Sequence, residues 1–231
     1  MELLNKINNN NAKIAVVGLG YVGLPLSFAF LKNGFNVIGL DTDQNKIDSL
    51  LQGKSYFKHI KIQELPEFID NKKFIPSNNF NHIKNADVII ICVPTPLNKF
   101  REPDLNPILS SASMIKDYLK KDQLVILESS TYPGTTDEVL TKELEKSGLN
   151  ANEDFYIAYS PEREDPGNKS FNTSTIPKIV GADTPESRKL TENLYKKVIS
   201  GGVVAVSSSR TAEATKLTEN IFRSVNIALV N

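Results

Sequence analysis

Residues 14–23 read IAVVGLGYVG, a short apolar run that passes directly into a glycine-rich turn. The run 14–17 is continuously apolar, as expected of a strand that is buried on both faces. Gly18, Gly20 and Gly23 follow in the spacing G-x-G-x-x-G. In this spacing the first glycine permits a tight turn, the second lets the backbone approach a pyrophosphate, and the third lets a helix pack on the strand. The stretch predicts the opening unit of a dinucleotide-binding fold.

An acidic residue stands at the end of the next expected strand. Residues 36–40 form a second β-rich run, and Asp41 follows it directly. A carboxylate here accepts hydrogen bonds from ribose hydroxyls and repels a 2′-phosphate, so the pattern predicts NAD rather than NADP. The pyrophosphate would face the helix that begins near Gly23, whose free N–H groups and dipole stabilise an anion without Lys or Arg. Lys46 is either a second residue near the adenine ribose or a solvated helix lysine, and the sequence favours neither.

The rest of the chain alternates short β-rich runs with longer helical stretches. This alternation predicts an α/β protein, a Rossmann-like, doubly wound, mostly parallel sheet with helices on both faces, followed by a long central helix. Strands are expected at 14–17, 36–40, 88–93, 124–127, 155–158, 178–180 and 203–206. Helices are expected from 23 to 31, after 43 to about 51, and near 108–119, 135–146, 184–198 and from about 209 onward. The stretch 53–85 is polar and poorly periodic, so no element is predicted there.

Composition excludes several classes of function. The 231 residues include 27 basic and 27 acidic ones, so no net charge attracts nucleic acid or anionic lipid. No apolar run approaches the roughly 20 residues that span a bilayer, and residues 1–11 are polar, unlike a signal peptide. We therefore expect a cytoplasmic protein. The single cysteine, Cys92, fits a reducing compartment, and its place inside an expected strand favours a core residue over a nucleophile.

Two loops that carry hydroxyl groups follow strands expected at one edge of the sheet. Thr95 lies in the segment VPTPL at 93–97, and Ser130 and Thr131 lie beyond the run 124–127. Open α/β sheets bind ligands at the carboxyl ends of their strands, so the two loops are a predicted wall of the cofactor site. The alternative is that these hydroxyls cap the helices that follow, and for Thr135 capping is the preferred interpretation.

Charged residues gather in a later loop and on the last helix. The loop 159–168, which contains Glu162 and Arg163, either orients a polar substrate or is a solvated surface loop. In the last helix Lys216 and Asn220 are one turn apart and share a face beside an apolar stripe. Such a lysine either extends its amine to solvent or stabilises an oxyanion, and the residues alone favour the first.

Taken in order, these motifs resemble those of the UDP-glucose/GDP-mannose dehydrogenase family. The resemblance runs from about residue 13 to 231 and rests on VGLGYVGLP (17–25), VPTPL (93–97), STYPGT (130–135) and PER (161–163). Glu102-Pro103-Asp104 and the loop PEREDPGN (161–168) resemble the UDP-N-acetylglucosamine or UDP-N-acetylgalactosamine 6-dehydrogenases of the family. UDP-glucose enzymes usually have a second glutamate where Pro166 stands here, so the role of that glutamate does not carry over.

The resemblance implies an NAD-dependent oxidation of a UDP-N-acetylhexosamine at C6, from alcohol to carboxylate, with two NAD per turnover. A cysteine thiolate captures the intermediate aldehyde, and the resulting thioester is hydrolysed. Glu162 is implied as general acid/base or water activator, Lys216 with Asn220 as oxyanion stabiliser, and Thr131 as a further catalytic residue. The implied substrate contacts are Glu162, Arg163, Lys216 and Asn220. The implied cofactor contacts are Gly18, Gly20, Tyr21, Val22, Gly23, Asp41, Lys46, Val93, Thr95, Ser130 and Thr131.

The family's catalytic cysteine lies in a Gly-x-Cys segment of its carboxyl-terminal half, which this sequence does not contain. Because the last helix also runs to Asn231 without a cap, we expect a truncated amino-terminal part that does not complete turnover alone. The expected division is a polar extension at 1–12, an NAD-binding domain at 13–206 and the start of a central, homodimer-forming helix at 207–231, with the UDP-binding domain absent. The alternatives are a UDP-glucose or UDP-N-acetylmannosamine dehydrogenase, and a non-catalytic NAD-binding or dimerisation module.

Overall fold

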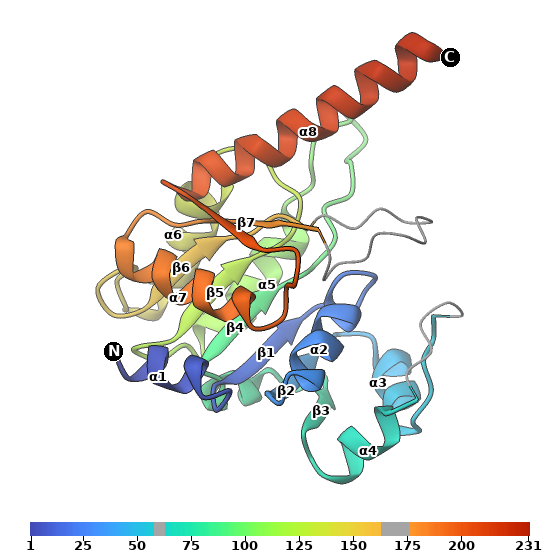
Figure 1. Cartoon of the computed structure of the whole chain (residues 1–231), viewed down its shortest axis with the longest axis vertical. Coiled ribbons are helices and arrows are strands. Elements are labelled where there is room, and N and C mark those ends of the chain that lie inside the picture. Colours follow the sequence, from blue (N-terminus) through green and yellow to red (C-terminus); the bar gives the residue numbers. More distant parts are fainter. Residues whose placement is uncertain (58–62, 163–175) are drawn as a thin grey trace.

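The computed structural model describes residues 1–57, 63–162 and 176–231, and an eight-stranded sheet forms its centre (Figure 1). The strand order is β3-β2-β1-β4-β5-β6-β7-β8. Strands β1 to β6 are parallel, whereas β7 is antiparallel to β6 and parallel to β8. The bounds are β1 Lys13–Val17, β2 Asn36–Leu40, β3 Phe74–Ser77, β4 Val88–Ile91, β5 Leu124–Leu127, β6 Tyr156–Tyr159, β7 Lys178–Gly181 and β8 Val203–Val206. The predicted Rossmann-like, mostly parallel sheet is confirmed.

Helices cover both faces of the sheet, and each layer encloses its own apolar core. Side chains of α1, α2, α3, α4 and α7 pack on one face, and those of η1, α5, η2 and α6 pack on the other. The α-helices are α1 Glu2–Asn8, α2 Gly23–Lys32, α3 Gln44–Leu51, α4 Leu65–Asp70, α5 Asn106–Lys116, α6 Thr141–Leu144, α7 Pro185–Lys196 and α8 Ser209–Val230. The shorter helical turns are η1 Phe80–Asn85, η2 Thr135–Leu140 and η3 Glu145–Ser147.

The chain reverses its direction of travel across the sheet beside β1, which has β2 on one side and β4 on the other. At such a point the loops after the two central strands leave in opposite directions and open a crevice at the carboxyl ends of the strands. Strands β4 and β5 are fully buried, which fits their continuous runs of branched aliphatic residues. The fold therefore places the glycine turn after β1 and the hydroxyl loops after β4 and β5 at one edge.

Three segments differ from the sequence-based expectation. Residues 1–12 contain α1, whose Leu3 and Ile7 are buried against the domain. The stretch 53–85 contains α4, β3 and η1, and β3 tolerates Pro76 because it is the edge strand of the sheet. The expected helix 135–146 is divided into a π-helical turn, one α-helical turn and a 3₁₀ turn.

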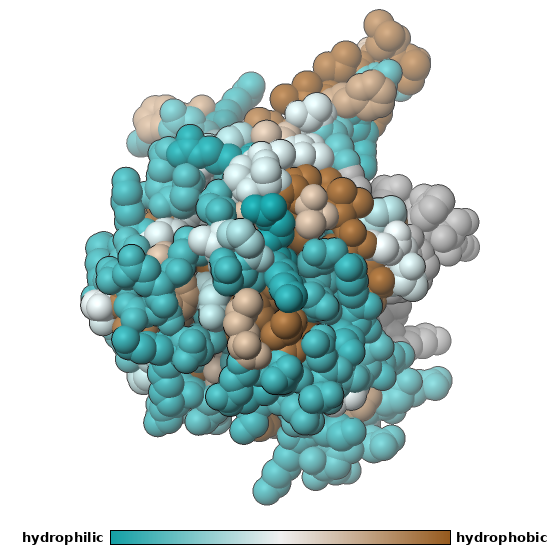
Figure 2. Space-filling model, turned by 60° about the vertical axis from the view of Figure 1, so that its left-hand side comes forward, coloured by the Kyte–Doolittle hydropathy of each residue, from teal (hydrophilic) through white to brown (hydrophobic). Residues whose placement is uncertain are grey.

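Helix α8 extends away from the body of the protein (Figure 1). Its buried residues, Ser209, Ala212 and Glu213, all lie in its first turns, and residues 221–230 are exposed. Apolar side chains gather along this projecting end, while most of the same face of the body is hydrophilic (Figure 2). Within the described residues, none of the helices has the length and apolar character needed to cross a membrane.

Candidate cofactor and catalytic site

The turn after β1 requires glycine at two positions. Gly18 has φ +93°, a backbone conformation that residues with a side chain rarely adopt, and a Cβ there would lie 2.7 Å from the carbonyl oxygen of Cys92. A Cβ on Gly23 would lie 1.9 Å from the carbonyl oxygen of Gly18, so α2 packs directly on the turn. Gly20 instead has no atom within 4 Å of such a Cβ and faces open space. That space, beside the start of α2, suits a pyrophosphate.

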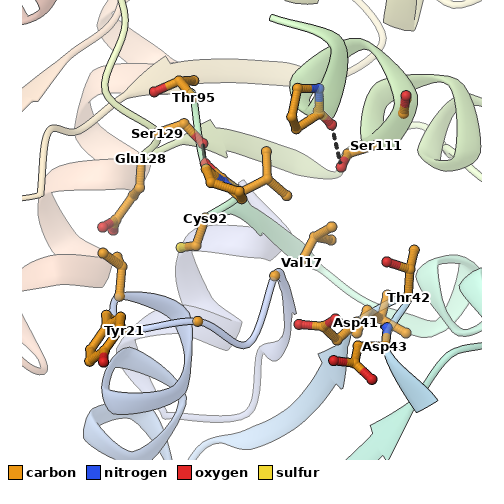
Figure 3. A pocket seen from close by; sticks show the side chains of 18 of the residues that line it. Val17, Tyr21, Asp41, Thr42, Asp43, Cys92, Thr95, Ser111, Glu128 and Ser129 are labelled. Atoms are coloured by element: carbon orange, nitrogen blue, oxygen red, sulfur yellow. Dashed lines mark hydrogen bonds between the residues drawn. The ribbon is translucent and has the colours of Figure 1, made fainter. Parts of the chain in front are cut away.

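The turn forms the middle of a cleft of about 630 Å³ at the carboxyl ends of the strands. Asp41 and Asp43 lie at one end of the cleft, and Glu128 and Cys92 lie toward the other (Figure 3). The cleft brings together most of the residues predicted from the sequence to bind the cofactor, and Glu162 with them: Gly18, Gly20, Tyr21, Val22, Asp41, Lys46, Val93, Thr95, Ser130 and Glu162.

The remaining predicted residues are placed differently. Gly23 lies within α2 behind the turn, and Thr131 is not among the residues that line the cleft. Lys216 reaches the backbone of Glu162, whereas Asn220 is one turn farther out on α8 and is exposed. Arg163 lies outside the described residues.

The carboxylate of Asp41 is held in place by its neighbours. Its Oδ2 accepts hydrogen bonds from the backbone N–H of Leu19 (2.9 Å) and from Nζ of Lys46 (2.8 Å), and its Oδ1 accepts one from the N–H of Asp43 (2.9 Å). A carboxylate has about four acceptor positions, so one remains for a ribose hydroxyl. Lys46 thus pairs with Asp41 in the lining of the cleft, and its contact with a ribose stays a prediction.

The two hydroxyl loops are joined to each other at the other end of the cleft. The hydroxyl of Thr95 donates to the carbonyl oxygen of Ser130 (2.7 Å), and that of Ser129 donates to the carbonyl oxygen of Val93 (2.7 Å). These reciprocal bonds connect the segments after β4 and β5 into one wall. Neither hydroxyl caps a helix. A dinucleotide laid across the turn with its adenosine ribose at Asp41 would place its nicotinamide half at this wall.

Burial governs the thiol of Cys92, which lies at this end of the cleft. Its side chain is buried, and burial together with the charge of Glu128 raises the pKa of the thiol well above its ordinary value. A thiol that resists ionisation is a poor nucleophile. The structure therefore agrees with the expectation that Cys92 is a core residue.

Buried charges gather around Glu162 at this end of the cleft, in a cluster that sequence reasoning missed. Oε2 of Glu128 is 3.0 Å from Nζ of Lys178, and the hydroxyl of Tyr195 donates to Oε1 of Glu128. Nζ of Lys178 is also 3.9 Å from Oε2 of Glu162. Burial raises the pKa of Glu128. Burial alone would lower the pKa of Lys178, but the charges of Glu128 and Glu162 outweigh it and raise that pKa.

A local signal for this cluster exists in the sequence. Glu128 ends the apolar run 124–127, and Lys178 begins the apolar run 179–180. A charged residue next to a buried strand is drawn toward the core, and charged residues are almost never fully buried unless they are paired. Each of these two charges therefore calls for a partner of opposite sign. Because the two residues are 50 positions apart, the signal does not say that they pair with each other.

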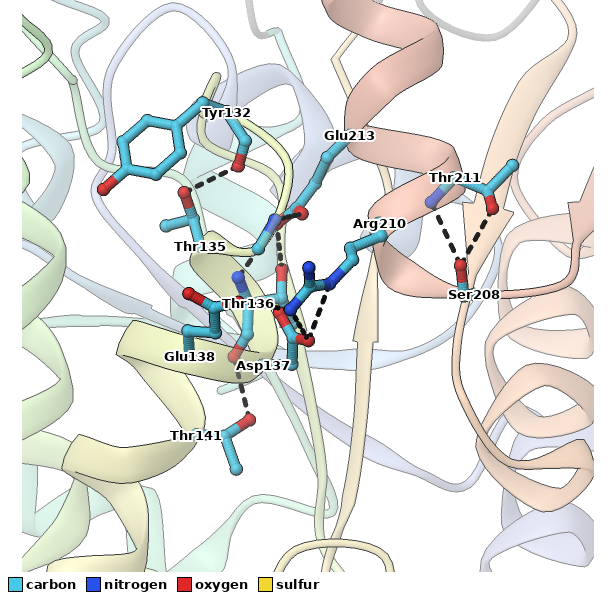
Figure 4. Close-up of polar contacts among 11 residues, drawn as sticks. Tyr132, Thr135, Thr136, Asp137, Glu138, Thr141, Ser208, Arg210, Thr211 and Glu213 are labelled. Carbon is cyan, nitrogen blue, oxygen red and sulfur yellow. Dashed lines mark hydrogen bonds and ion pairs between the residues drawn. The ribbon is translucent and has the colours of Figure 1, made fainter.

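Helix α8 is attached to the loop after β5 by a buried carboxylate (Figure 4). Glu213 accepts hydrogen bonds from the N–H of Gly134 (2.6 Å), the N–H of Thr136 (2.9 Å) and the hydroxyl of Thr136 (2.7 Å). Glu213, a residue of α8, therefore caps the helical turn that begins at Thr135. The expectation that Thr135 caps this helix is wrong, since its hydroxyl donates to the carbonyl oxygen of Tyr132.

One turn after Glu213, the ammonium of Lys216 donates to the backbone carbonyl oxygen of Glu162. Lys216 is partly buried, so its amine does not simply extend to solvent. The loop after β6 and the helix α8 thus meet at the end of the cleft. This meeting point has a carboxylate and an ammonium, the groups that general acid/base catalysis and oxyanion stabilisation require.

The family model described as "UDP-glucose/GDP-mannose dehydrogenase family, NAD binding domain" matches residues 12–199. The chain belongs to this family. A UDP-N-acetyl-D-glucosamine 6-dehydrogenase of Pseudomonas aeruginosa is 42% identical over 220 residues, which are 95% of this chain and 51% of that protein. Protein CapL of Staphylococcus aureus is 40% identical over 222 residues, which are 96% and 51% of the two chains.

Solved structures of family members show the same fold. The UDP-D-ManNAc dehydrogenase of Pyrococcus horikoshii has a TM-score of 0.84 at 35% identity, covering 94% of this chain and 52% of that one. The NDP-N-acetyl-D-galactosaminuronic acid dehydrogenase of Methanosarcina mazei has a TM-score of 0.85 at 33% identity, covering 100% and 52%. The chain spans about half the length of the relatives it matches.

As the NAD-binding domain of this family, the chain takes NAD as its cofactor, and the cleft suits it. Asp41 offers an acceptor position that suits a ribose hydroxyl, and the open space at Gly20 leaves room for a pyrophosphate beside the N-terminus of α2. A phosphate on the ribose would meet a buried carboxylate, and this charge repulsion favours NAD over NADP.

Proposed function

We propose that this chain is the NAD-binding part of an NAD-dependent UDP-N-acetylhexosamine 6-dehydrogenase. Such an enzyme oxidises the C6 alcohol of the UDP-sugar to a carboxylate and uses two NAD per turnover. The observation that carries the proposal is the meeting of Glu162 and Lys216 at the end of the cleft opposite Asp41. The relatives named UDP-N-acetyl-D-glucosamine 6-dehydrogenase, 42% and 36% identical, support this class of substrate.

The roles proposed for the chain's own residues follow from their chemistry. When bound, NAD supplies the hydride acceptor. The carboxylate of Glu162 takes the proton from the hydroxyl that is oxidised or from the water that attacks later. The ammonium of Lys216 stabilises the oxyanion that develops, and Asn220, farther along the same face of α8, extends this set of donors toward the sugar. Thr95, Ser130 and Thr131 belong to the cofactor side, with Thr131 as a further catalytic residue.

A UDP-N-acetylmannosamine dehydrogenase is a second candidate. It is supported by relatives of that name, 34% and 37% identical, and by the P. horikoshii structure. The epimers differ by the orientation of one substituent on the sugar ring. The experiment must therefore compare several UDP-sugars.

The test begins with the cofactor. Isothermal titration of the folded chain with NAD should give saturable binding, and Asp41→Ala should weaken it. The full-length gene product is then assayed with UDP-N-acetylglucosamine, UDP-N-acetylgalactosamine, UDP-N-acetylmannosamine and UDP-glucose by the absorbance of NADH. Two NADH formed per UDP-N-acetylglucosamine or UDP-N-acetylgalactosamine support the proposal. Binding of NAD without NADH production from any of the four sugars would leave a non-catalytic NAD-binding module instead.

The proposal includes the division of the chain and its assembly. Residues 13–206 form the NAD-binding domain, and residues 207–231 begin a central helix. The 231 residues alone carry out little four-electron oxidation, because their single cysteine, Cys92, is a buried thiol and a poor nucleophile. A second copy would cover the exposed apolar residues of α8, which include Leu217, Ile221, Val225 and Leu229. Light scattering after size-exclusion chromatography should then show a homodimer that Ile221→Asp dissociates. A cytoplasmic location completes the proposal, and fractionation of cells tests it.

A further inference from the structure

The direction of β7 determines which residue reaches the cofactor edge of the sheet. Strands β1 to β6 are parallel, so their first residues lie at the edge opposite to the cleft. Strand β7 runs the other way, with Tyr159 paired to Gly181. Continued along the strands, this register places residue 178 opposite residue 162, and the hydroxyl of Ser160 donates to the carbonyl oxygen of Ile179 (2.8 Å) between them. The first residue of β7, Lys178, therefore lies at the edge where β5 ends.

The ammonium of Lys178 is held on its far side by a rigid set of partners. Its side chain is 4% exposed, and its Nζ lies 3.0 Å from Oε2 of Glu128. The hydroxyl of Tyr195 donates to the other oxygen of Glu128, and Nζ is 4.8 Å from the centroid of the Tyr195 ring. Both oxygens of Glu128 thus face donors, as in an ionised carboxylate, and the aromatic face adds a cation–π contact. A lysine side chain is flexible by nature, so these contacts decide where its charge is.

The free side of this ammonium faces Glu162. Nζ of Lys178 is 3.9 Å from Oε2 of Glu162, which is an ion-pair distance. The side chain of Glu162 is 10% exposed, and a carboxylate this far from water depends on a nearby cation. Lys216 binds the same residue from α8, but through the backbone carbonyl oxygen. Glu162 is therefore contacted at its main chain by one lysine and at its carboxylate by another.

We propose that Lys178 is a positioning residue for Glu162: anchored by Glu128 and Tyr195, it holds the Glu162 carboxylate at the nicotinamide end of the cleft. Lys178 is not among the residues that line the cleft, so it acts on the site through Glu162. The effect on catalysis rests on the proposed function, whereas the contact between the two side chains does not. Two experiments separate these parts.

The first experiment observes the lysine ammonium groups of the isotope-labelled chain by nitrogen–hydrogen correlation NMR at neutral pH. An exposed ammonium exchanges its protons too fast to be seen, so Lys178 should give a protected signal that Lys178→Arg removes. Glu162→Gln and Tyr195→Phe should both shift this signal. Asp154→Asn is the matched control, because it removes the carboxylate partner of the exposed Lys121, and it should leave the signal unchanged. A missing signal, or one that Glu162→Gln does not move, would overturn the inference.

The second experiment is a double-mutant cycle in the full-length gene product. We expect Lys178→Met to lower kcat about tenfold or more, equivalent to about 1.4 kcal/mol, with the NAD dissociation constant unchanged within about threefold. Lys178→Arg should restore most of the rate. In a Glu162→Gln background, Lys178→Met should cause no further loss, because a residue that acts only through Glu162 has nothing left to position.

A purely structural lysine would give losses that multiply in the double variant, and this result would refute the inference. If Lys178→Met does not fold, Tyr195→Phe replaces it in the cycle, with a smaller loss that also vanishes in the Glu162→Gln background. A wild-type protein that is inactive toward every UDP-sugar would contradict the proposed function. The NMR experiment would then still decide whether Lys178 holds Glu162.

Discussion

Removing the carboxylate of Glu213 should destabilise the protein more than removing any exposed ion pair of α8. Glu213 is fully buried and accepts three hydrogen bonds from Gly134 and Thr136. At about 1.5 kcal/mol for each hydrogen bond to a charged group, the three contribute about 4.5 kcal/mol. Burial raises the pKa of Glu213, so the desolvation of the carboxylate opposes the stabilisation by these hydrogen bonds. Glu213→Ala should therefore lower the free energy of unfolding by about 3 kcal/mol.

Thermal unfolding followed by circular dichroism measures the effect. For a chain of this size, a loss of about 3 kcal/mol lowers Tm by about 6 to 12 °C. Arg210→Ala is the matched control, because Arg210 lies on the same helix and pairs with Asp137 and Glu138 of the same helical turn, but at the surface. An exposed pair contributes about 0 to 1 kcal/mol, so this variant should shift Tm by less than about 4 °C. If Glu213→Ala costs no more than Arg210→Ala, Glu213 does not cap the turn as described.

Three further predictions concern the cleft. Gly23→Ala should abolish folding or NAD binding, because the new Cβ would lie 1.9 Å from the carbonyl oxygen of Gly18. Gly20→Ala has open space around its Cβ, so this variant should keep the Tm and lose NAD affinity in isothermal titration. Equal behaviour of the two variants would contradict their different roles. Asp41→Asn should weaken NAD binding about tenfold, or by about 1.4 kcal/mol. It should also reduce the factor by which the chain binds NAD more tightly than NADP. An unchanged ratio of the two dissociation constants would count against the assignment of Asp41 as the ribose-binding residue. Burial raises the pKa of Cys92, so little thiolate forms at pH 8, and a thiol reagent should label the native chain far more slowly than the unfolded chain. Labelling should accelerate as the pH rises toward that elevated pKa. Fast labelling of the native chain at pH 8 would show that the thiol is not buried as described.

The parts of the fold that the sequence predicted are those determined by local interactions. The apolar run before Gly18, the glycine spacing and the position of Asp41 all depend on residues within one βαβ unit, so the first half of the site was foreseen. The edge strand β3 was not, because Pro76 and its polar neighbours weaken the alternation that marks a strand. Helix α1 has only seven residues, and its formation depends on burying Leu3 and Ile7 rather than on its own propensity.

The parts that were missed depend on residues far apart in the chain. The apolar run 178–180 does not reveal the direction of β7 in the sheet. The position of Lys178 at the cofactor edge, which depends on that direction, was therefore not predicted. The pairing of Glu213 with Thr136 joins residues 77 positions apart, and no periodic pattern encodes it. For the same reason, Thr135 was assigned the capping role that a carboxylate from another helix fulfils.

The attachment of α8 has a mechanical consequence. The helix is held through its first turns, and from Glu213 to Val230 it extends about 25 Å at about 1.5 Å per residue. A tilt of about 5° around Glu213 moves the outer end by about 2 Å but moves Lys216 by only about 0.4 Å. Conversely, a contact that fixes the outer end of the helix also fixes Lys216 relative to Glu162. Because Lys216 lies close to the pivot, its positional error is several-fold smaller than the error at the outer end. The position of Lys216 at the end of the cofactor cleft is therefore mechanically coupled to the orientation of the distant, exposed end of α8.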